Sequence, residues 1–388
     1  MLPKKISEIV NNNVKIISQK INFKKDFFGD TPAPFIGRYN YPNVNVGILS
    51  AIDYENKEEL DNQNNWLQNQ KSVSDIVNIR SSLVNSRMKS NVYSKINKLN
   101  DLAKEVGIAT GCVETEVNLK DTPQFKLTTS NYSTPHGPNV EMQKAKITSN
   151  PKVDVKVEKA HYDTDLKSSQ ALKELYDKGI SESHLSQILS VGALGIGKNR
   201  KLVPTRWSIT ATDDTIGKAL IDEIKHNDQI DNYKLYFGGV LGNYYLILYF
   251  PEVFGYELFE MSLQHPDSYS TDYEFYSGRK TYSENCEGGY YTVRLAITEQ
   301  LKKIKSQATA IAFRFITSEY TAPLGVWVTK EATRKSLQSK PFDFNSKQEL
   351  IEMARKIVRE EFNFNLDKLL VKSVLLKNLS SQRKLFEF

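Results

Sequence analysis

Cysteine is nearly absent from this chain, which has only two such residues, Cys112 and Cys286, among 388. Two widely separated thiols cannot form the four-ligand site of a zinc ribbon. In an intracellular protein we expect them to be reduced rather than bridged. The five histidines include no pair at the helical spacing of a metal site, so we predict no metal and no other cofactor.

Long apolar runs are also missing. No stretch of about 18 apolar residues occurs, and the N-terminus lacks the apolar core of a signal peptide. These absences argue against a membrane partner and predict a soluble, cytoplasmic protein. A length of 388 residues suffices for two or three cores, at roughly 100 to 200 residues per domain.

Neither sign of charge dominates, since 52 Lys and Arg stand against 46 Asp and Glu. The net charge of +6 permits a nucleic-acid partner without requiring one. Only 12 of the basic residues are Arg, so each is a candidate for a site that needs a planar, bidentate group. An Arg at the edge of a core looks the same in sequence. Five lie near Gly, Pro, Trp or aromatic residues: Arg38, Arg206, Arg279, Arg294 and Arg314.

The patterns along the chain predict an α+β protein with a mixed, largely antiparallel sheet flanked by helices, and a flexible C-terminal tail. The composition becomes rich in Gly and Pro at Gly29, and a pair of Ser residues stands at 380–381 near the end of the chain. These two changes suggest domain boundaries. We predict an N-terminal amphipathic segment (1–28), a larger N-terminal domain (29–265), a smaller C-terminal domain (266–379) and the tail (380–388).

Local periodicity predicts individual elements. An irregular connection is expected to hold His136 between two prolines, and a half-buried strand is expected to end near Glu158. Either side chain can serve as an acid, a base or a ligand. The predicted elements include two helices over 74–107, the irregular connection over 120–150, the strand over 151–162, a hairpin over 233–250 and a short strand over 326–328.

The stretch Lys201–Gly217 concentrates residues that bind anions or take part in chemistry. Pro204 fixes its own φ and favours an extended residue before it, so Arg206 and Trp207 are expected on a loop. Both are candidates to bind nucleic acid or phosphate.

A helix is predicted to follow this loop, with Thr212 as its N-cap and two carboxylates in its first turn. Two interpretations stay open: the carboxylates only begin a helix, or they face one cleft with the preceding Arg and Trp. Under the second, the catalytic candidates are Asp213, Asp214, Glu158 and His136.

A turn-rich segment near the N-terminus carries a dense set of aromatic residues. Phe35, Arg38, Tyr39 and Tyr41 can stack on a base or a ribose as readily as on the core. Arg38 is therefore a further nucleic-acid or phosphate-binding candidate, as is Arg294.

A glycine-rich run at 192–199 nearly matches the phosphate-binding P-loop. Asn199 stands where a hydroxyl should hold magnesium, and Pro204 blocks the helix that should follow, so we reject an ATPase. The backbone N–H groups of such a loop, together with Lys198, can still hold a phosphate of another ligand.

The final residues form a candidate docking peptide. A Gln, a Leu three positions later and nearby aromatics can make a short helical turn whose apolar side chains fill a groove. This peptide resembles the motif Gln-x-x-Leu-x-x-Phe that binds the sliding clamp PCNA, with one terminal aromatic where the fullest form has two. The residues concerned are Gln382, Leu385, Phe386 and Phe388.

Several longer segments resemble the archaeal Nre DNA repair proteins. They are Pro34–Pro42, Gly137-Pro138, Asn150-Pro151 with Val157–Lys159, Leu202–Ala211, Gly288–Arg294 and Pro323–Trp327. The resemblance implies a role in DNA damage repair and binding to the archaeal sliding clamp through the terminal peptide. Some members carry an N-terminal cysteine cluster that looks zinc-binding, and this chain lacks it.

Two hypotheses follow. In the first, the clamp recruits a repair factor whose body binds DNA or other repair proteins. In the second, the chain is an enzyme that acts on damaged or modified nucleic acid, as a nuclease or a base- or nucleotide-processing enzyme, with a central Arg/Trp/Asp-Asp site.

Overall fold

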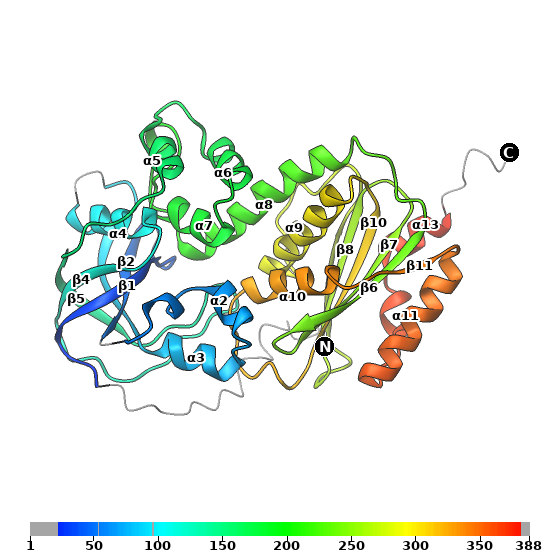
Figure 1. Ribbon diagram of the computed structural model, residues 1–388, viewed down its shortest axis with the longest axis horizontal. Coiled ribbons are helices and arrows are strands. Elements are labelled where there is room, and N and C mark those ends of the chain that lie inside the picture. The colour runs from blue at the N-terminus through cyan, green and yellow to red at the C-terminus, as the bar shows by residue number, and fades with distance from the viewer. Residues whose placement is uncertain (1–21, 53, 95–96, 382–388) are drawn as a thin grey trace. The chain divides into compact units, whose positions relative to one another are not determined.

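The computed structural model describes residues 22–52, 54–94 and 97–381, and these form two compact units (Figure 1). The barrel unit comprises the described residues up to Ile216 together with Ala322–Trp327. The sheet unit comprises Gly217–Thr321 and the described residues from Val328 onward. Helices accompany a barrel in one unit and a mixed sheet in the other, so the chain is α+β, as predicted.

The barrel unit is built on five strands that close in the order β1-β2-β3-β5-β4. Strands β3 and β5 pair in parallel, and the other neighbours pair antiparallel. Helix α4 (Lys98–Ile108) connects β3 to β4. This strand order and helix position are those of the oligonucleotide-binding (OB) fold, a five-stranded Greek-key barrel. The strands are β1 (Asp26–Ile36), β2 (Asn43–Ile52), β3 (Leu83–Asn91), β4 (Val113–Leu119) and β5 (Asn139–Ile147).

Every second residue of β2 faces the inside of the barrel. Val44, Val46 and Ile48 of β2 are fully buried, as the period of two requires. Three buried hydroxyls also point inward, and Thr31 Oγ1 lies 2.6 Å from Ser50 Oγ and 2.7 Å from Thr115 Oγ1. These three hydroxyls satisfy one another.

Helices surround the barrel in the same unit. Ser72 and Asp75 form a capping box at the start of α3, which places its apolar face on the core. Helix α8 begins in this unit and continues into the sheet unit. The elements are η2 (Lys57–Glu59), α2 (Gln63–Gln68), α3 (Val73–Ser81), α5 (Val155–Tyr162), α6 (Ser168–Asp177), α7 (Glu182–Ser190), η3 (Gly197–Asn199) and α8 (Thr205–Ile224).

The sheet unit contains a six-stranded sheet in the order β11-β6-β7-β10-β8-β9, with only β10 and β8 parallel. The predicted hairpin is confirmed, and Leu241 and Gly242 both take positive φ in its tight turn. The strands are β6 (Tyr233–Val240), β7 (Asn243–Phe250), β8 (Gly255–Ser262), β9 (Tyr269–Glu274), β10 (Thr309–Ile316) and β11 (Phe342–Phe344).

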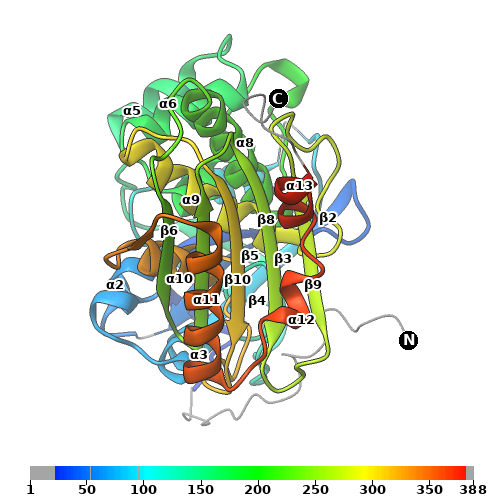
Figure 2. The ribbon, with the colours of Figure 1, turned by 90° about the vertical axis from the view of Figure 1, so that its right-hand side faces the viewer.

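Helices cover both faces of this sheet. Ile247, Ala310 and Ala312 face α9 and α10 in one core, and Leu248, Ile311 and Phe313 face α11 to α13 in the other. Figure 2 shows α11 lying across the face of the sheet that is turned to the viewer. The helices are α9 (Glu287–Lys303), α10 (Trp327–Leu337), α11 (Lys347–Phe362), α12 (Asp367–Leu370) and α13 (Val374–Ser381).

Four local predictions are wrong, each because tertiary pairing or a cap overrides the pattern. Residues 83–91 form β3 between two helices, since they pair with β2. Residues 139–147 form β5 inside the predicted irregular connection. Asp154 caps α5 by accepting a hydrogen bond from Lys156 N at 2.7 Å, so this segment is helical rather than a strand. Trp327 begins α10 instead of lying in a strand.

The start of α8 also differs from the prediction. The helix begins at Thr205, and Pro204 O accepts hydrogen bonds from Trp207 N and Ser208 N at 2.8 and 2.9 Å. Proline suits the entry to a helix because its missing N–H has no partner there. Asp213 and Asp214 consequently lie more than two turns inside α8 and not in its first turn.

None of the helices in the described part of the chain combines the length and the apolar composition that crossing a membrane requires. The predicted domain boundaries at residues 28, 265 and 379 stay predictions.

Candidate nucleic-acid interface

An aromatic–basic cluster lies at one end of the barrel. It is formed by three segments that are far apart in sequence: the connection between β1 and β2, the residue that follows β3 by two positions, and the entry to α8. Its members are Arg38, Tyr39, Tyr41, Tyr93, Lys201 and Trp207.

Backbone contacts fix these segments against one another. Val92 N donates to Pro42 O at 2.9 Å, and Leu202 N donates to Val92 O at 3.2 Å. Ile36 N donates to Thr205 Oγ1 at 2.9 Å, which ties the last residue of β1 to the first turn of α8. The cluster therefore rests on the barrel framework, as a preformed binding surface should.

Lys201 joins two of the tyrosines. Its Nζ donates hydrogen bonds to Tyr93 Oη at 3.1 Å and to Tyr41 Oη at 3.2 Å. These bonds raise the pKa of Lys201, with Tyr93 as the largest cause, so its positive charge is retained at neutral pH. The ring of Tyr41 lies 5.2 Å from that of Trp207, so aromatic surface continues from the lysine to α8.

The cluster is open to solvent. Tyr39 is 72% exposed, Tyr93 52% and Trp207 43%, although aromatic rings of this size are usually buried in a monomer. Arg38 lies 4.9 Å from the centre of the Tyr39 ring. Exposed aromatics with interleaved cations are the features that bind single-stranded nucleic acid, because rings stack on bases and cations attract phosphates.

Arg206 lies deeper than the cluster. Its guanidinium carbon is 3.5 Å from the centre of the Tyr132 ring, and Nη2 donates to Tyr132 Oη. Tyr132 O in turn accepts from Val326 N at 3.1 Å. Gly325, with φ of +93°, allows this approach, since a Cβ there would lie 2.7 Å from Ser133 C. Arg206 thus positions the loop that follows β4 and does not extend freely into solvent.

His136 is buried within the barrel unit, only 2% exposed. Its Nδ1 lies 2.9 Å from Gly137 O, and its ring packs edge-on against Phe35 at 5.1 Å. Burial lowers the pKa of His136 to about 4, and Arg80 and Arg87 lower it further against the opposing Gly137 bond. The imidazole is therefore neutral at pH 7, and Nδ1 is the protonated nitrogen that donates to the carbonyl.

The remaining candidates occupy different environments. Glu158 is exposed on α5, and Lys198 is exposed on η3. Asp213 is buried on the same side of α8 as Arg206, about 10 Å further along the axis, whereas Asp214 is half-buried. Arg294 lies in the sheet unit, buried beside Glu274. The clamp-binding residues Gln382, Leu385, Phe386 and Phe388 lie outside the described residues.

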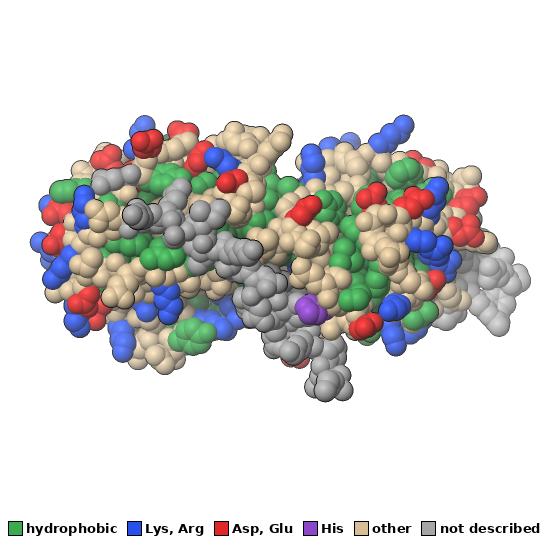
Figure 3. Space-filling view, turned by 90° about the horizontal axis from the view of Figure 1, so that it is seen from below, with side chains coloured by type: hydrophobic (Ala, Val, Ile, Leu, Met, Phe, Trp, Pro, Cys, Tyr) green, Lys and Arg blue, Asp and Glu red, His purple; other side chains and the backbone are tan. Residues whose placement is uncertain are grey.

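No three His, Cys, Asp or Glu side chains in the described ranges gather closely enough to hold a metal ion. On the face drawn in Figure 3, Lys and Arg side chains alternate with Asp and Glu side chains. Charge of one sign therefore does not mark an interface on that face, and the aromatic residues are the more specific signal.

Sequence reasoning missed two residues that complete the site, Tyr93 and Tyr132. Tyr93 stands alone in a polar run inside a segment that was predicted to be helical, and only the pairing of β3 with β2 brings it beside Tyr41. Tyr132 lies in the connection after β4, where the apolar residues follow neither a helical nor a strand period, so the sequence does not indicate which side chains are buried. A lone Tyr among polar residues was the one available hint.

Comparisons with known proteins match both parts of the chain to one family. Residues 4–268 match the family model described as Archaeal Nre, N-terminal, and residues 274–388 match Archaeal Nre, C-terminal. No solved structure matches.

Three curated relatives agree. The DNA repair protein NreA of Haloferax volcanii is 33% identical over 81% of this chain and 79% of its own length. DNA repair proteins NreB and NreA of Archaeoglobus fulgidus are 31% and 34% identical, over 95% and 85% of this chain and 93% and 84% of their own lengths. The segments Pro34–Pro42 and Leu202–Ala211, which carry the resemblance in sequence, meet at the aromatic–basic cluster. The chain belongs to the archaeal Nre family.

Proposed function

We propose that this chain is a DNA repair protein that binds single-stranded DNA at the aromatic–basic cluster and is recruited by the sliding clamp through residues 382–388. The names of its relatives support the repair role. The observation that carries the DNA-binding part is the exposed set Tyr41, Tyr93 and Trp207 around Lys201.

Single strands fit this cluster better than duplex DNA. Stacking requires the face of a base, which a duplex hides between its neighbours, whereas a single strand exposes it. The OB-fold topology adds support, because OB barrels bind oligonucleotides on the β2–β3 face and its adjoining loops. Lys89 of β3 lies beside Asn45 of β2 on the outer side of that face and adds a further cation. Fold alone would not suffice, so the proposal depends on these side chains.

Clamp recruitment is supported by sequence alone. The motif at residues 382–388 follows α13 directly, so a clamp that holds it would keep the chain near DNA. Tethering raises the effective concentration of DNA at the cluster, so a weak single-strand site is enough for function.

A titration with a labelled single-stranded oligonucleotide tests the DNA-binding part. Trp207→Ala should weaken binding roughly 5- to 150-fold, which corresponds to the ~1–3 kcal/mol of one stacked base. Tyr162→Ala is the matched control, because Tyr162 is also an exposed aromatic of the barrel unit but lies on α5 outside the cluster. Equal affinities for the two variants would refute the assignment of the cluster.

A separate titration with the sliding clamp tests recruitment. Removal of residues 382–388 should abolish clamp binding and leave the affinity for the oligonucleotide unchanged. If the shortened chain bound the clamp as tightly as the full chain, the terminal motif would have no part in recruitment.

A further inference from the structure

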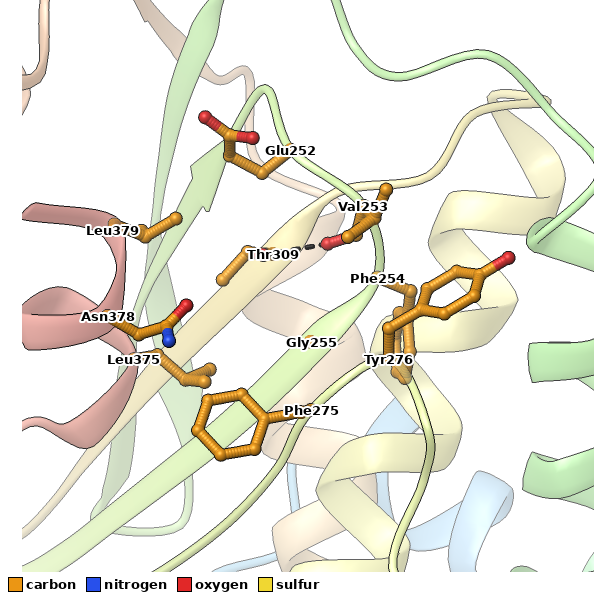
Figure 4. Close-up of a pocket in the computed structure, with 10 residues that line it drawn as sticks. All are labelled: Glu252, Val253, Phe254, Gly255, Phe275, Tyr276, Thr309, Leu375, Asn378 and Leu379. Atoms are coloured by element: carbon orange, nitrogen blue, oxygen red, sulfur yellow. Dashed lines mark hydrogen bonds between the residues drawn. The ribbon is translucent and has the colours of Figure 1, made fainter. Parts of the chain in front are cut away.

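A pocket of about 290 Å³ lies in the sheet unit, far in sequence from the aromatic–basic cluster (Figure 4). This volume is at the small end for ligand pockets, so it suits a few side chains of a peptide. Its walls include the β7–β8 connection, the residues after β9 and helix α13 from its first turn onward. The residues that matter below are Val253, Phe254, Phe275, Tyr276, Leu375 and Leu379.

The pocket has an apolar floor and an exposed apolar rim. Phe254 and Leu375 are buried, whereas Val253, Phe275 and Tyr276 each expose more than a third of their surface. Figure 4 shows Tyr276 on the side of the pocket opposite α13, with Phe275 drawn between Tyr276 and Leu375. Neighbouring exposed apolar side chains beside a hollow are the mark of a surface that binds another apolar group.

Helix α13 is firmly held where it forms the pocket wall. The buried carboxylate of Glu257 accepts from Ser373 Oγ at 2.5 Å, Val374 N at 2.9 Å and Leu375 N at 3.1 Å. At the other end, Lys347 Nζ donates to Ser380 Oγ at 2.8 Å. Hydrogen bonds thus hold both ends of α13 in place. The chain that follows the helix starts within one turn of Leu379, which lines the pocket.

We propose that residues 382–388 of the same chain occupy this pocket, with Leu385 and Phe386 on its apolar floor. Seven residues span at most about 23 Å, so they can turn back from the end of α13 to any part of the pocket. Their apolar side chains match Phe254, Leu375 and Leu379, and the polar side chains of Thr309 and Asn378 also line the pocket.

The charges match as well. Gln382 at the start of the tail is followed by the cations Arg383 and Lys384, and the rim of the pocket carries the anion Glu252. The anion Glu387 follows later in the tail, and a cation is available for it beside the pocket. Lys225 Nζ lies 4.5 Å from the centre of the Tyr276 ring.

Occupation of the pocket regulates clamp recruitment, a consequence that rests on the proposed function. The same apolar side chains cannot fill the clamp groove and the pocket at once, so only the released fraction of the tail binds the clamp. If the tail is docked nine-tenths of the time, release raises the apparent clamp affinity about 10-fold.

Fluorine NMR of the full chain tests docking without the clamp. With 4-fluorophenylalanine at position 386, the resonance should differ from that of an isolated peptide of residues 380–388 with the same label. Val253→Asp and, independently, Phe275→Asp should return it to the peptide value, because a charged group at the rim disfavours an apolar occupant. Val155→Asp, at another exposed apolar site on α5, should leave the resonance unchanged.

Each other result overturns the proposal. A full-chain resonance equal to that of the peptide, or one that ignores both rim variants, would show that the tail does not occupy the pocket. A shift that varies with protein concentration would place the tail on a second copy. The clamp titration is read separately. Docking confirmed by fluorine, with clamp binding but no gain in clamp affinity for Val253→Asp, would overturn the regulation. Docking confirmed by fluorine, with no clamp binding by either chain, would overturn clamp recruitment and uphold the pocket.

Discussion

Cations lie beside aromatic rings in both units, but under opposite conditions. In the sheet unit, Arg314 Nη1 donates to Glu260 Oε1 at 2.7 Å, and Arg294 Nη1 lies 3.2 Å from Glu274 Oε2. All four side chains are buried. In the barrel unit, Lys201 bonds to the hydroxyl groups of two exposed tyrosines.

The difference decides what each group can do. A buried cation has lost its water and depends on its carboxylate partner, so it holds the fold together and reaches no ligand. An exposed cation keeps its water and can exchange a phenol oxygen for a phosphate at little cost. The same pairing of residue types therefore marks a structural network in one unit and a candidate binding surface in the other.

Loss of a buried cation should give the largest effect. Arg314→Met leaves Glu260 buried without its ion-pair partner and should lower the free energy of unfolding by about 3–5 kcal/mol. Urea unfolding followed by circular dichroism measures this loss. Arg38→Met, at an exposed position, should change stability by no more than about 0.5 kcal/mol.

Adding Glu260→Gln to Arg314→Met tests whether the lost stability comes from the unpaired carboxylate or from lost packing. Burial raises the pKa of Glu260, and Arg314 opposes that rise, so Glu260→Gln should recover much of the stability lost in Arg314→Met. A double variant as unstable as the single one would mean that the guanidinium acts through packing, through its bonds to Asn243, or through both.

Acid should destabilise the barrel unit through His136. The folded state holds the neutral imidazole down to about pH 4, whereas the unfolded chain takes up a proton below about pH 6.5. Stability from this residue is therefore present above pH 6.5 and lost as the pH falls towards 4, by about 3 kcal/mol in total.

Comparison with His136→Asn isolates this contribution, since the other titrating groups are common to both proteins. The Asn amide can still donate to Gly137 O but does not titrate. The unfolding free energy of the unsubstituted chain should fall more steeply than that of the variant between pH 6.5 and pH 4.5. Parallel curves would show that His136 is accessible to protons in the folded state.

The contrast between the two units also explains which features of the site could be predicted from the sequence. Segments 34–42 and 202–211 were identified, and Arg38 and Trp207 with them, because stiff Gly-Pro-aromatic runs stand out from a Lys- and Asn-rich chain. Arg294 follows a similar Gly-Gly-Tyr-Tyr run, yet it is buried. Burial depends on strand register: β10 and β8 place Arg314 directly beside Glu260, 54 residues earlier, and no local pattern contains that pairing.

The closed barrel escaped prediction for the same reason. Its closure needs the pairing of β1 with β4 and of β3 with β5, and β3 and β5 both lay in segments that were predicted otherwise. The sheet unit was easier, because the β6–β7 hairpin is local and its two strands pair across a tight turn.

The smallest expected effect is on salt dependence. Each phosphate contact made by a cation on a single strand contributes about 0.7 to the slope of log affinity against log salt. Lys201→Met should lower the slope by about that amount, with little change in unfolding free energy, because an exposed hydrogen bond contributes little. Lys356→Met on α11, an exposed lysine of the sheet unit, should leave the slope unaltered. If both variants changed the slope equally, DNA would be attracted by the overall charge, and the distinction between an open cluster and a closed network would lose its functional meaning.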